Sequence, residues 1–175
     1  MSPKISILGE DGAHAFSLLA RLDIAELWLV APGAVAVADE AVARADGRRR
    51  VHGSEDRGDL RGSVVVVLAR AASDAELLEL SRVAPDAILV VAGGDLEQEC
   101  GRVLEVTSLP RPRVIGVANA EVAAEVAAAV FRCVVRCQGE AGLEGVHTVR
   151  ARVGAGGVTE VLSGAGGVSL SRPAP

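Results

Sequence analysis

The sequence predicts an α/β fold: a doubly wound parallel sheet of about six strands, followed by a short C-terminal antiparallel β meander. Short apolar runs alternate with segments of helical spacing along most of the chain, and strands that alternate with helices form right-handed βαβ crossovers. Half of the 175 residues are hydrophobic, yet only 2% are aromatic. A core of Val, Ala, Leu and Ile suits parallel strands that helices cover on both faces.

The first part of the chain predicts three strands and two helices. Residues 4–9 form a β-rich run that ends in glycine, and apolar residues at helical spacing follow over residues 12–22. A second strand covers residues 25–30, where a Pro-Gly pair ends it before an alanine-rich helix over residues 34–45. Residues 48–52 predict a third, edge-like strand, and the polar stretch after them predicts a loop.

The clearest strand signal lies over residues 63–69, because four consecutive valines favour a strand that is buried on both faces. Ser73, with Glu76 three residues later, forms a capping-box pattern that opens a helix to about Val83. Residues 87–92 then predict a fifth strand.

The alternation ends with a helix over residues 96–106, a sixth strand over residues 113–117 and a long helix. Asn119 can cap this last helix, which extends to about Cys137. Residues 1–138 therefore predict a single doubly wound domain.

The pattern changes over residues 139–175, which predict a separate β-rich tail. Residues 146–153 alternate apolar with polar side chains, as a half-exposed strand does. The sequence Gly-Ala-Gly-Gly-Val occurs twice, at residues 154–158 and 164–168. Because each glycine cluster can form a turn beside the segment 158–162, the tail predicts a small antiparallel meander.

Charge and composition narrow the classes of partner and the compartment. A net charge of −5 and a pI near 5.2 argue against nucleic acid or an anionic membrane as the main partner. No targeting segment is visible, and the apolar runs are far shorter than a membrane span, so we expect a soluble, cytoplasmic protein. Cys100, Cys133 and Cys137 have no framework spacing and are expected as free thiols, with no metal site.

The turn after the first predicted strand is the natural ligand site of this architecture, because its glycines let the backbone approach a pyrophosphate. The residues that could contact a cofactor there are Gly9, Asp11, Gly12, Ala13, His14 and Ala15. Glu10 and Asp11 oppose phosphate charge, although they suit the N-terminus of a helix without a ligand. The turn is therefore either a nucleotide site or a structural remnant of one.

Other signatures of cofactor binding or catalysis are missing from the sequence. No carboxylate follows the second strand to hold a ribose, no Gly-Lys-Ser/Thr follows the first strand, and no G-x-S-x-G occurs. His52 and His147 have no evident acidic partner in sequence, and His14 is expected on the surface. We therefore predict no catalytic residue.

Five segments of the chain resemble those of one protein family, both in their sequences and in their order. They are residues 4–9, 18–30, 59–67, 84–91 and 109–117. Together they resemble the lactate/malate dehydrogenase family. The resemblance covers residues 4 to about 137 and corresponds to the NAD-binding, Rossmann-type half of that family. It implies a Rossmann fold, NAD as a possible cofactor and, for an intact member, the NAD-dependent oxidation of 2-hydroxy acids.

The departures from the family fall on its functional positions. After the fourth strand the family carries a mobile loop with substrate-binding arginines, and here only Arg70 is cationic. The family's Thr-Asn-Pro is replaced by Ala-Gly-Gly at residues 92–94, and its Gly-Glu-His-Gly aligns with residues 139–142 or 154–157, neither of which contains histidine. The tail then corresponds to a remnant of the family's substrate domain.

These observations predict a truncated, degenerate pseudoenzyme that acts as a scaffold or protein-interaction module. A protein partner or a second copy is expected at the helix around Val122–Val134, where an apolar stripe is either core or interface. The stripe consists of Val122, Ala123, Val126, Ala127, Val130, Phe131 and Val134. Two alternatives stay open: a sensor of NAD or an adenine nucleotide at Gly9–Ala15, and an NAD-dependent oxidoreductase completed by a partner chain.

Overall fold

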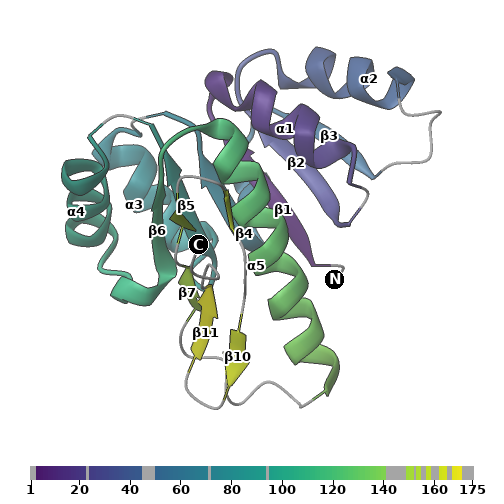
Figure 1. Cartoon of the computed structure of the whole chain (residues 1–175). Helices are drawn as coiled ribbons and strands as arrows, with labels where there is room; N and C mark the ends of the chain where they lie inside the picture. Colours follow the sequence, from purple (N-terminus) through teal and green to yellow (C-terminus); the bar gives the residue numbers. More distant parts are fainter. Residues whose placement is uncertain are drawn as a thin grey trace.

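The computed structural model contains a six-stranded sheet with the strand order β3-β2-β1-β4-β5-β6, in which every neighbouring pair is parallel. The structure describes residues 3–22, 24–44, 50–70, 72–93, 95–140, 149–151, 153–154, 157–158, 162–164 and 167–170, with side-chain surroundings through residue 135. This strand order confirms the predicted doubly wound parallel sheet (Figure 1).

The observed elements follow the predicted alternation closely. The strands are β1 (Lys4–Leu8), β2 (Glu26–Val30), β3 (Val51–Ser54), β4 (Ser63–Leu68), β5 (Ile88–Ala92) and β6 (Val114–Val117). The helices are α1 (Ala13–Ala20), α2 (Ala34–Arg44), α3 (Asp74–Val83), α4 (Leu96–Thr107) and α5 (Ala120–Glu140). Three 3-10 turns connect them: η1 (Glu10–Gly12), η2 (Arg57–Leu60) and η3 (Arg111–Arg113).

Within the large sheet, the largest difference from the prediction lies around β3. The strand is at the edge of the sheet, as predicted, but it extends to Ser54 rather than ending at residue 52. The polar stretch after it contains η2, where the carboxylate of Asp56 accepts a hydrogen bond from the N–H group of Gly58. The polar sequence predicted a loop here. It did not predict the 3-10 turn, because that turn is formed by a local polar capping contact and has no hydrophobic periodicity.

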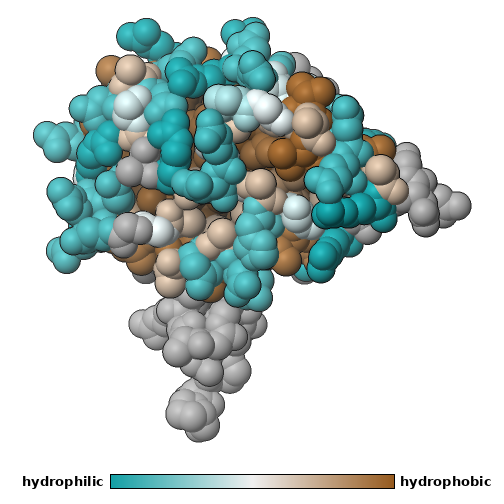
Figure 2. All heavy atoms as spheres, turned by 90° about the horizontal axis from the view of Figure 1, so that it is seen from above, coloured by the Kyte–Doolittle hydropathy of each residue, from teal (hydrophilic) through white to brown (hydrophobic). Residues whose placement is uncertain are grey.

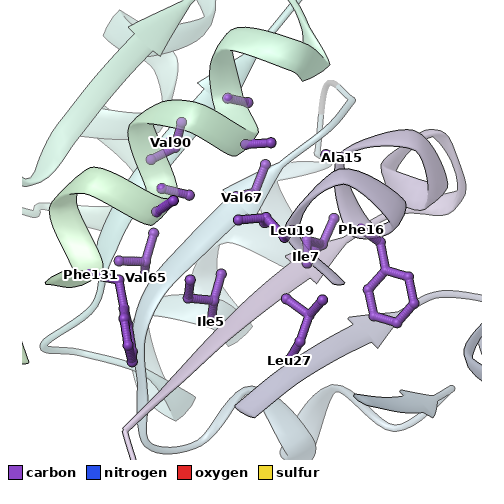
Figure 3. Packing of buried hydrophobic residues seen from close by; sticks show 14 of the residues in the cluster. Ile5, Ile7, Ala15, Phe16, Leu19, Leu27, Val65, Val67, Val90 and Phe131 are labelled. Atoms are coloured by element: carbon purple, nitrogen blue, oxygen red, sulfur yellow. The ribbon is translucent and has the colours of Figure 1, made fainter. Parts of the chain in front are cut away.

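Helices cover both faces of the sheet (Figure 1). Residues of α1, α2 and α5 pack in one hydrophobic cluster, and residues of α3, α4 and η2 pack in a second cluster on the other face. Along β1 the side chains alternate between these clusters, with Ile5 and Ile7 in the first and Leu8 in the second. Figure 3 shows the first cluster, where Val65 and Val67 of β4 lie between β1 and α5.

The apolar stripe of α5 belongs to this first cluster. Six of its seven residues are buried: Ala123, Val126, Ala127, Val130, Phe131 and Val134. Val122 is partly buried and packs against the same cluster. Of the two interpretations of the stripe, core and interface, the structure therefore supports core. A partner contact at this helix stays a prediction, and the buried side chains of the stripe are not the ones available for it.

The tail forms short strands in two small sheets: β7 (Val149–Ala151), β8 (Val153–Gly154), β9 (Gly157–Val158), β10 (Leu162–Gly164) and β11 (Gly167–Leu170). Each glycine repeat gives its own antiparallel pair, β8 with β9 and β10 with β11. The predicted single antiparallel meander is not what forms, because β7 pairs with β11 in parallel and the two hairpins belong to different sheets. The predicted boundary at residue 138 falls inside α5, which ends at Glu140.

One edge of the large sheet carries a row of three polar side chains. Trp28 of β2 lies between its neighbours, with the Nζ atom of Lys4 4.6 Å from the centre of its ring. The His52 ring stacks on it at a centroid distance of 4.6 Å.

Within the described part of the chain, no helix is both long enough and apolar enough to cross a membrane.

Candidate functional site

A crevice opens at the carboxyl ends of the central strands. Its volume is about 410 Å³, and it lies beside β1, β2 and the segment that follows β4. The lining residues are Leu8, Gly9, Glu10, Val30, Ala31, Pro32, Glu55, Arg57, Arg70, Glu76 and Glu79. The strand order reverses between β1 and β4, and open α/β sheets bind ligands at such a point. Figure 2 looks onto this end of the molecule, where hydrophobic atoms show between hydrophilic ones.

Gly9 lines the crevice in a backbone conformation that glycine adopts easily. Its φ is +106°, and its N–H group donates a hydrogen bond to the carbonyl oxygen of Val30 at 3.1 Å. A Cβ atom at this position would lie 3.0 Å from Cγ of Arg70. The side chain of Arg70 therefore lies directly against the turn between β1 and α1.

The other predicted residues of this turn lie elsewhere. A Cβ atom on Gly12 would lie 2.3 Å from Cγ2 of Ile7, so this glycine lets the turn pack on β1. Ala15 is fully buried in the core, whereas Ala13 is only half-buried. Among the predicted turn residues, Gly9 is the one that lines the crevice.

Asp11 and His14 are exposed. The Nε2 atom of His14 lies 3.6 Å from Oε1 of Glu121, and that of His52 lies 3.9 Å from Oε1 of Glu26. The fold thus brings two histidines close to acidic partners that their sequence positions did not indicate. Neither histidine lines the crevice, so these pairs add no acid–base group to it.

Glu76 is the centre of a cluster of charges in the wall of the crevice. Its Oε1 atom lies 2.8 Å from Nη2 of Arg57 and 2.6 Å from Nη2 of Arg70. Its Oε2 atom accepts hydrogen bonds from the backbone N–H group of Ser73 at 2.8 Å and from its hydroxyl group at 2.9 Å. The capping box predicted from Ser73 and Glu76 is confirmed, and the side chain of Glu76 is only 7% exposed.

The surroundings of Glu76 keep it ionised. Burial alone would raise the pKa of this carboxyl group, but the N–H group of Ser73, the guanidinium group of Arg70 and the hydroxyl of Ser73 outweigh it. Together they lower the pKa of Glu76 from 4.5 to about 2. The carboxylate therefore remains negative throughout the ordinary pH range, and it holds both arginines as a permanent counter-ion.

Three further glutamates line the crevice. Oε2 of Glu79 accepts a hydrogen bond from Nη1 of Arg57 at 3.0 Å, and Glu10 is exposed at the turn. Oε1 of Glu55 accepts one from the backbone N–H of Gly33 at 2.9 Å. The sequence predicted no carboxylate at the end of β2, yet Glu55 supplies one from the end of the neighbouring strand β3.

The charges of the lining do not suit a pyrophosphate. Four glutamates face two arginines, and both arginines are paired with carboxylates. Arg70 also covers the backbone of Gly9, which a pyrophosphate would have to approach. As the side chains stand, these charges oppose the close approach of a diphosphate group to the backbone of Gly9.

Sequence reasoning missed most of the charged lining. Arg57 and Glu76 are 19 residues apart, and no local pattern connects them. A usable signal was nevertheless present: Glu55 directly follows β3, and Arg70 lies two residues after β4. Because the carboxyl ends of parallel strands meet at one edge, charged residues at these positions lie near the switch point.

The described residues hold no group of three or more His, Cys, Asp or Glu side chains that could bind a metal ion. Cys100 and Cys133 form no disulfide, as predicted, whereas the side chain of Cys137 lies outside the described residues. Burial, with a smaller contribution from the charge of Glu99, raises the pKa of the Cys100 thiol. Cys100 therefore remains protonated at neutral pH.

Comparisons with known proteins find similarity in structure only. No protein-family model matches the sequence, and no curated protein matches it. Lactate dehydrogenase from Cryptosporidium parvum is similar with a TM-score of 0.60 at 20% identity, over 67% of this chain and 44% of that one. The complex of a Cryptosporidium parvum lactate dehydrogenase with lactic acid and nicotinamide adenine dinucleotide has a TM-score of 0.59 at 18% identity. The match covers 66% of this chain and 45% of that one. Malate dehydrogenase from Salinibacter ruber has a TM-score of 0.57 at 22% identity, over 66% of this chain and 44% of that one.

At these identities the likeness establishes the fold. The parallel sheet and its helices are those of the Rossmann-like half of lactate and malate dehydrogenases, as the sequence resemblance implied. The chain spans less than half the length of the dehydrogenases that it resembles.

Proposed function

We propose that this chain is a non-catalytic protein related to lactate and malate dehydrogenases, and that it acts by binding a protein partner or a second copy of itself. The observation that carries the proposal is the set of residues that line the crevice. Its two arginines are paired with Glu76, and none of its lining residues is a histidine. Reduction of a keto acid needs a proton donor, a carboxylate to orient it and an arginine for the substrate carboxylate.

The partner surface lies away from the buried stripe of α5. The exposed side of that helix carries Glu121, Glu125 and Arg132, so a contact made there is polar and sensitive to salt. We place this protein in the cytoplasm, which its acidic composition and short apolar runs support.

Two measurements test the proposal. In an absorbance assay with NAD and either lactate or malate, we expect no formation of NADH by the purified protein. Size-exclusion chromatography with light scattering should show a dimer, or a complex with a partner recovered by affinity purification. Turnover that is abolished by changing a residue of the crevice would establish an oxidoreductase. A stable monomer that captures no partner would equally contradict the proposal.

A second candidate function is the sensing of an adenine nucleotide, and Glu55 favours it. A carboxylate beside the end of β2 is where Rossmann-like folds hold the ribose hydroxyl groups of adenosine. Glu55 lies there, and its Oε1 atom accepts a hydrogen bond from the backbone N–H group of Gly33, the residue before α2. If this function is correct, calorimetry should detect binding of adenosine, and Glu55→Gln should weaken it about tenfold. Glu40→Gln on the far part of α2 is the matched control, since Glu40 pairs along its own helix with Arg44.

A further inference from the structure

Two guanidinium groups converge on one carboxylate oxygen in the wall of the crevice. Arg57 comes from η2 and Arg70 from the segment after β4, and their Nη2 atoms lie 2.8 and 2.6 Å from the same Oε1 atom of Glu76. The second oxygen is enclosed by the N–H and hydroxyl groups of Ser73. Both oxygen atoms of a buried carboxylate are thus surrounded by donors from three different segments.

These donors are the kind that binds phosphate groups. Arginine presents several N–H donors to an oxyanion, and a helix start with a serine hydroxyl adds a backbone N–H and an O–H group. Arg57 and Arg70 line the crevice, and Arg70 lies against Gly9 at the turn that faces the phosphates in this architecture. The donors therefore stand where an anionic ligand would need them, but a carboxylate of the chain itself already occupies them.

We propose that Glu76 is a built-in occupant of an anion-binding cradle formed by Arg57, Arg70 and Ser73, and that it keeps phosphate-bearing ligands out of the crevice. This autoinhibitory contact goes beyond the proposed function, because it holds whether or not the chain binds a protein partner. It opposes the second candidate function, since an adenine nucleotide carries the phosphate that Glu76 would exclude.

The competition favours the internal carboxylate for two reasons. Glu76 is attached to the same chain as the cradle, so its effective concentration there is far above that of a free anion. Its withdrawal would also break the capping box with Ser73 and loosen the first turn of α3. An external anion must therefore replace several contacts at once, which explains how a fold with two arginines at its switch point can exclude phosphate.

Glu76→Gln tests the proposal, because the amide removes the negative charge and sets an NH2 donor among the donors of the cradle, so an external anion can displace it more easily. Isothermal titration with inorganic pyrophosphate at constant ionic strength should show binding to this variant at least about tenfold tighter than to the wild-type protein. Glu79→Gln is the matched control: it removes a charge from the more exposed partner of Arg57, 46% exposed, and should change the affinity less than about twofold.

A second variant identifies the cradle as the place of binding. In the double variant Glu76→Gln/Arg70→Gln, the gained affinity for pyrophosphate should disappear. A wild-type protein that binds pyrophosphate as tightly as Glu76→Gln would overturn the proposal. So would an equal gain in Glu79→Gln, which would indicate a general effect of charge, or a gain that persists without Arg70.

The wild-type protein provides a test that does not depend on the folding of a variant. In NMR spectra of the arginine Nε–H groups, the signals of Arg57 and Arg70 should stay in place when pyrophosphate is added to about 10 mM. Shifts of these two signals, larger than the shift of the exposed Arg132, would show that the cradle is open and would contradict the proposal.

Discussion

At the scale of single residues, Glu76 connects its own helix start with two other segments, of which η2 is 19 residues away in sequence. It binds Arg57 of η2, Arg70 after β4 and Ser73 at the start of α3. A buried carboxylate is costly unless donors surround it, and here each of its oxygen atoms has two. Glu76 therefore holds the wall of the crevice together, in addition to its proposed role as the occupant of the anion-binding cradle.

Replacing Glu76 with alanine should destabilise the fold. The change removes the capping box and leaves Arg57 and Arg70 without their shared counter-ion, so we expect the free energy of unfolding in urea to fall by about 2–3 kcal/mol. Glu79→Ala, which removes only an exposed ion pair, should lower it by less than about 0.5 kcal/mol. Equal losses for the two variants would show that the contacts around Glu76 add no more stability than the exposed ion pair of Glu79.

The stability contributed by Glu76 should depend on pH. Its pKa is about 2 in the folded chain against an ordinary value of 4.5, so the folded state binds this proton less tightly than the unfolded state does. The contribution is full above pH 4.5 and is lost as the pH falls towards 2, for a total of up to about 3 kcal/mol. Urea unfolding between pH 5 and about 2 should show this extra decrease in the wild-type protein and not in Glu76→Gln. Parallel pH profiles for the two proteins would contradict it.

Residue-level prediction from the sequence worked where the contact is local. The pair Ser73 and Glu76 lies within one helical turn, and its capping box was predictable. The pairs of Arg57 with Glu76 and of Gly33 with Glu55 span 19 and 22 residues, and only the assembled sheet brings them together. The sequence therefore pointed to the turn at Gly9, which lines the crevice, but not to the charged side chains that surround it.

At the scale of elements, the packing of the first βα turn on β1 depends on a missing side chain. The backbone of Gly12, with φ −73° and ψ −11°, is acceptable for any residue. The constraint is steric, because a Cβ atom would lie 2.3 Å from the fully buried Ile7.

Gly12→Ala should therefore destabilise the protein by about 2–3 kcal/mol, because a β-branched side chain in a filled core cannot move aside. Gly101→Ala in α4 makes the opposite prediction: no atom lies within 4 Å of its added Cβ, and alanine is the better helix former. We expect a gain of about 0.5–1 kcal/mol. Thermal unfolding of both variants checks the pair, and a stable Gly12→Ala would show that the turn can lift from β1.

Elements were predictable where their signal is intrinsic. The four valines of β4 and the cap of α3 led to boundaries that agree within one residue. The edge strand β3 was shifted, because an edge strand has a polar, weakly periodic sequence and receives its register from β2. In the tail, the glycine repeats indicated turns, but which strand pairs with which is decided by contacts that short strands do not encode.

At the scale of the whole molecule, residues 5–135 already supply two extensive hydrophobic clusters, counted over the part of the chain whose side-chain surroundings the structure describes. A chain shortened to end at Glu140 should therefore unfold cooperatively in urea, with a loss of less than about 1 kcal/mol. This prediction also tests the proposed division into a Rossmann-like domain and a tail. Loss of the cooperative transition would show that the tail is an integral part of the domain.

The doubly wound architecture was the most predictable property of the chain. It follows from the regular alternation of apolar strands with helices and from the handedness of their connections, which do not depend on any one residue. The contents of the crevice are the opposite case, since the same sheet can present a pyrophosphate site or a closed cluster of charges with only a few substitutions.

The stack of Lys4, Trp28 and His52 gives the protein an optical reporter of its own. Trp28 is the only tryptophan, so the intrinsic fluorescence of the chain comes from one place, the edge formed by β1, β2 and β3. Separation of these strands would expose the indole ring to water and shift its emission to longer wavelengths. A loss of structure confined to β5 and β6 would leave the emission unchanged. The emission wavelength therefore distinguishes which side of the sheet unfolds first.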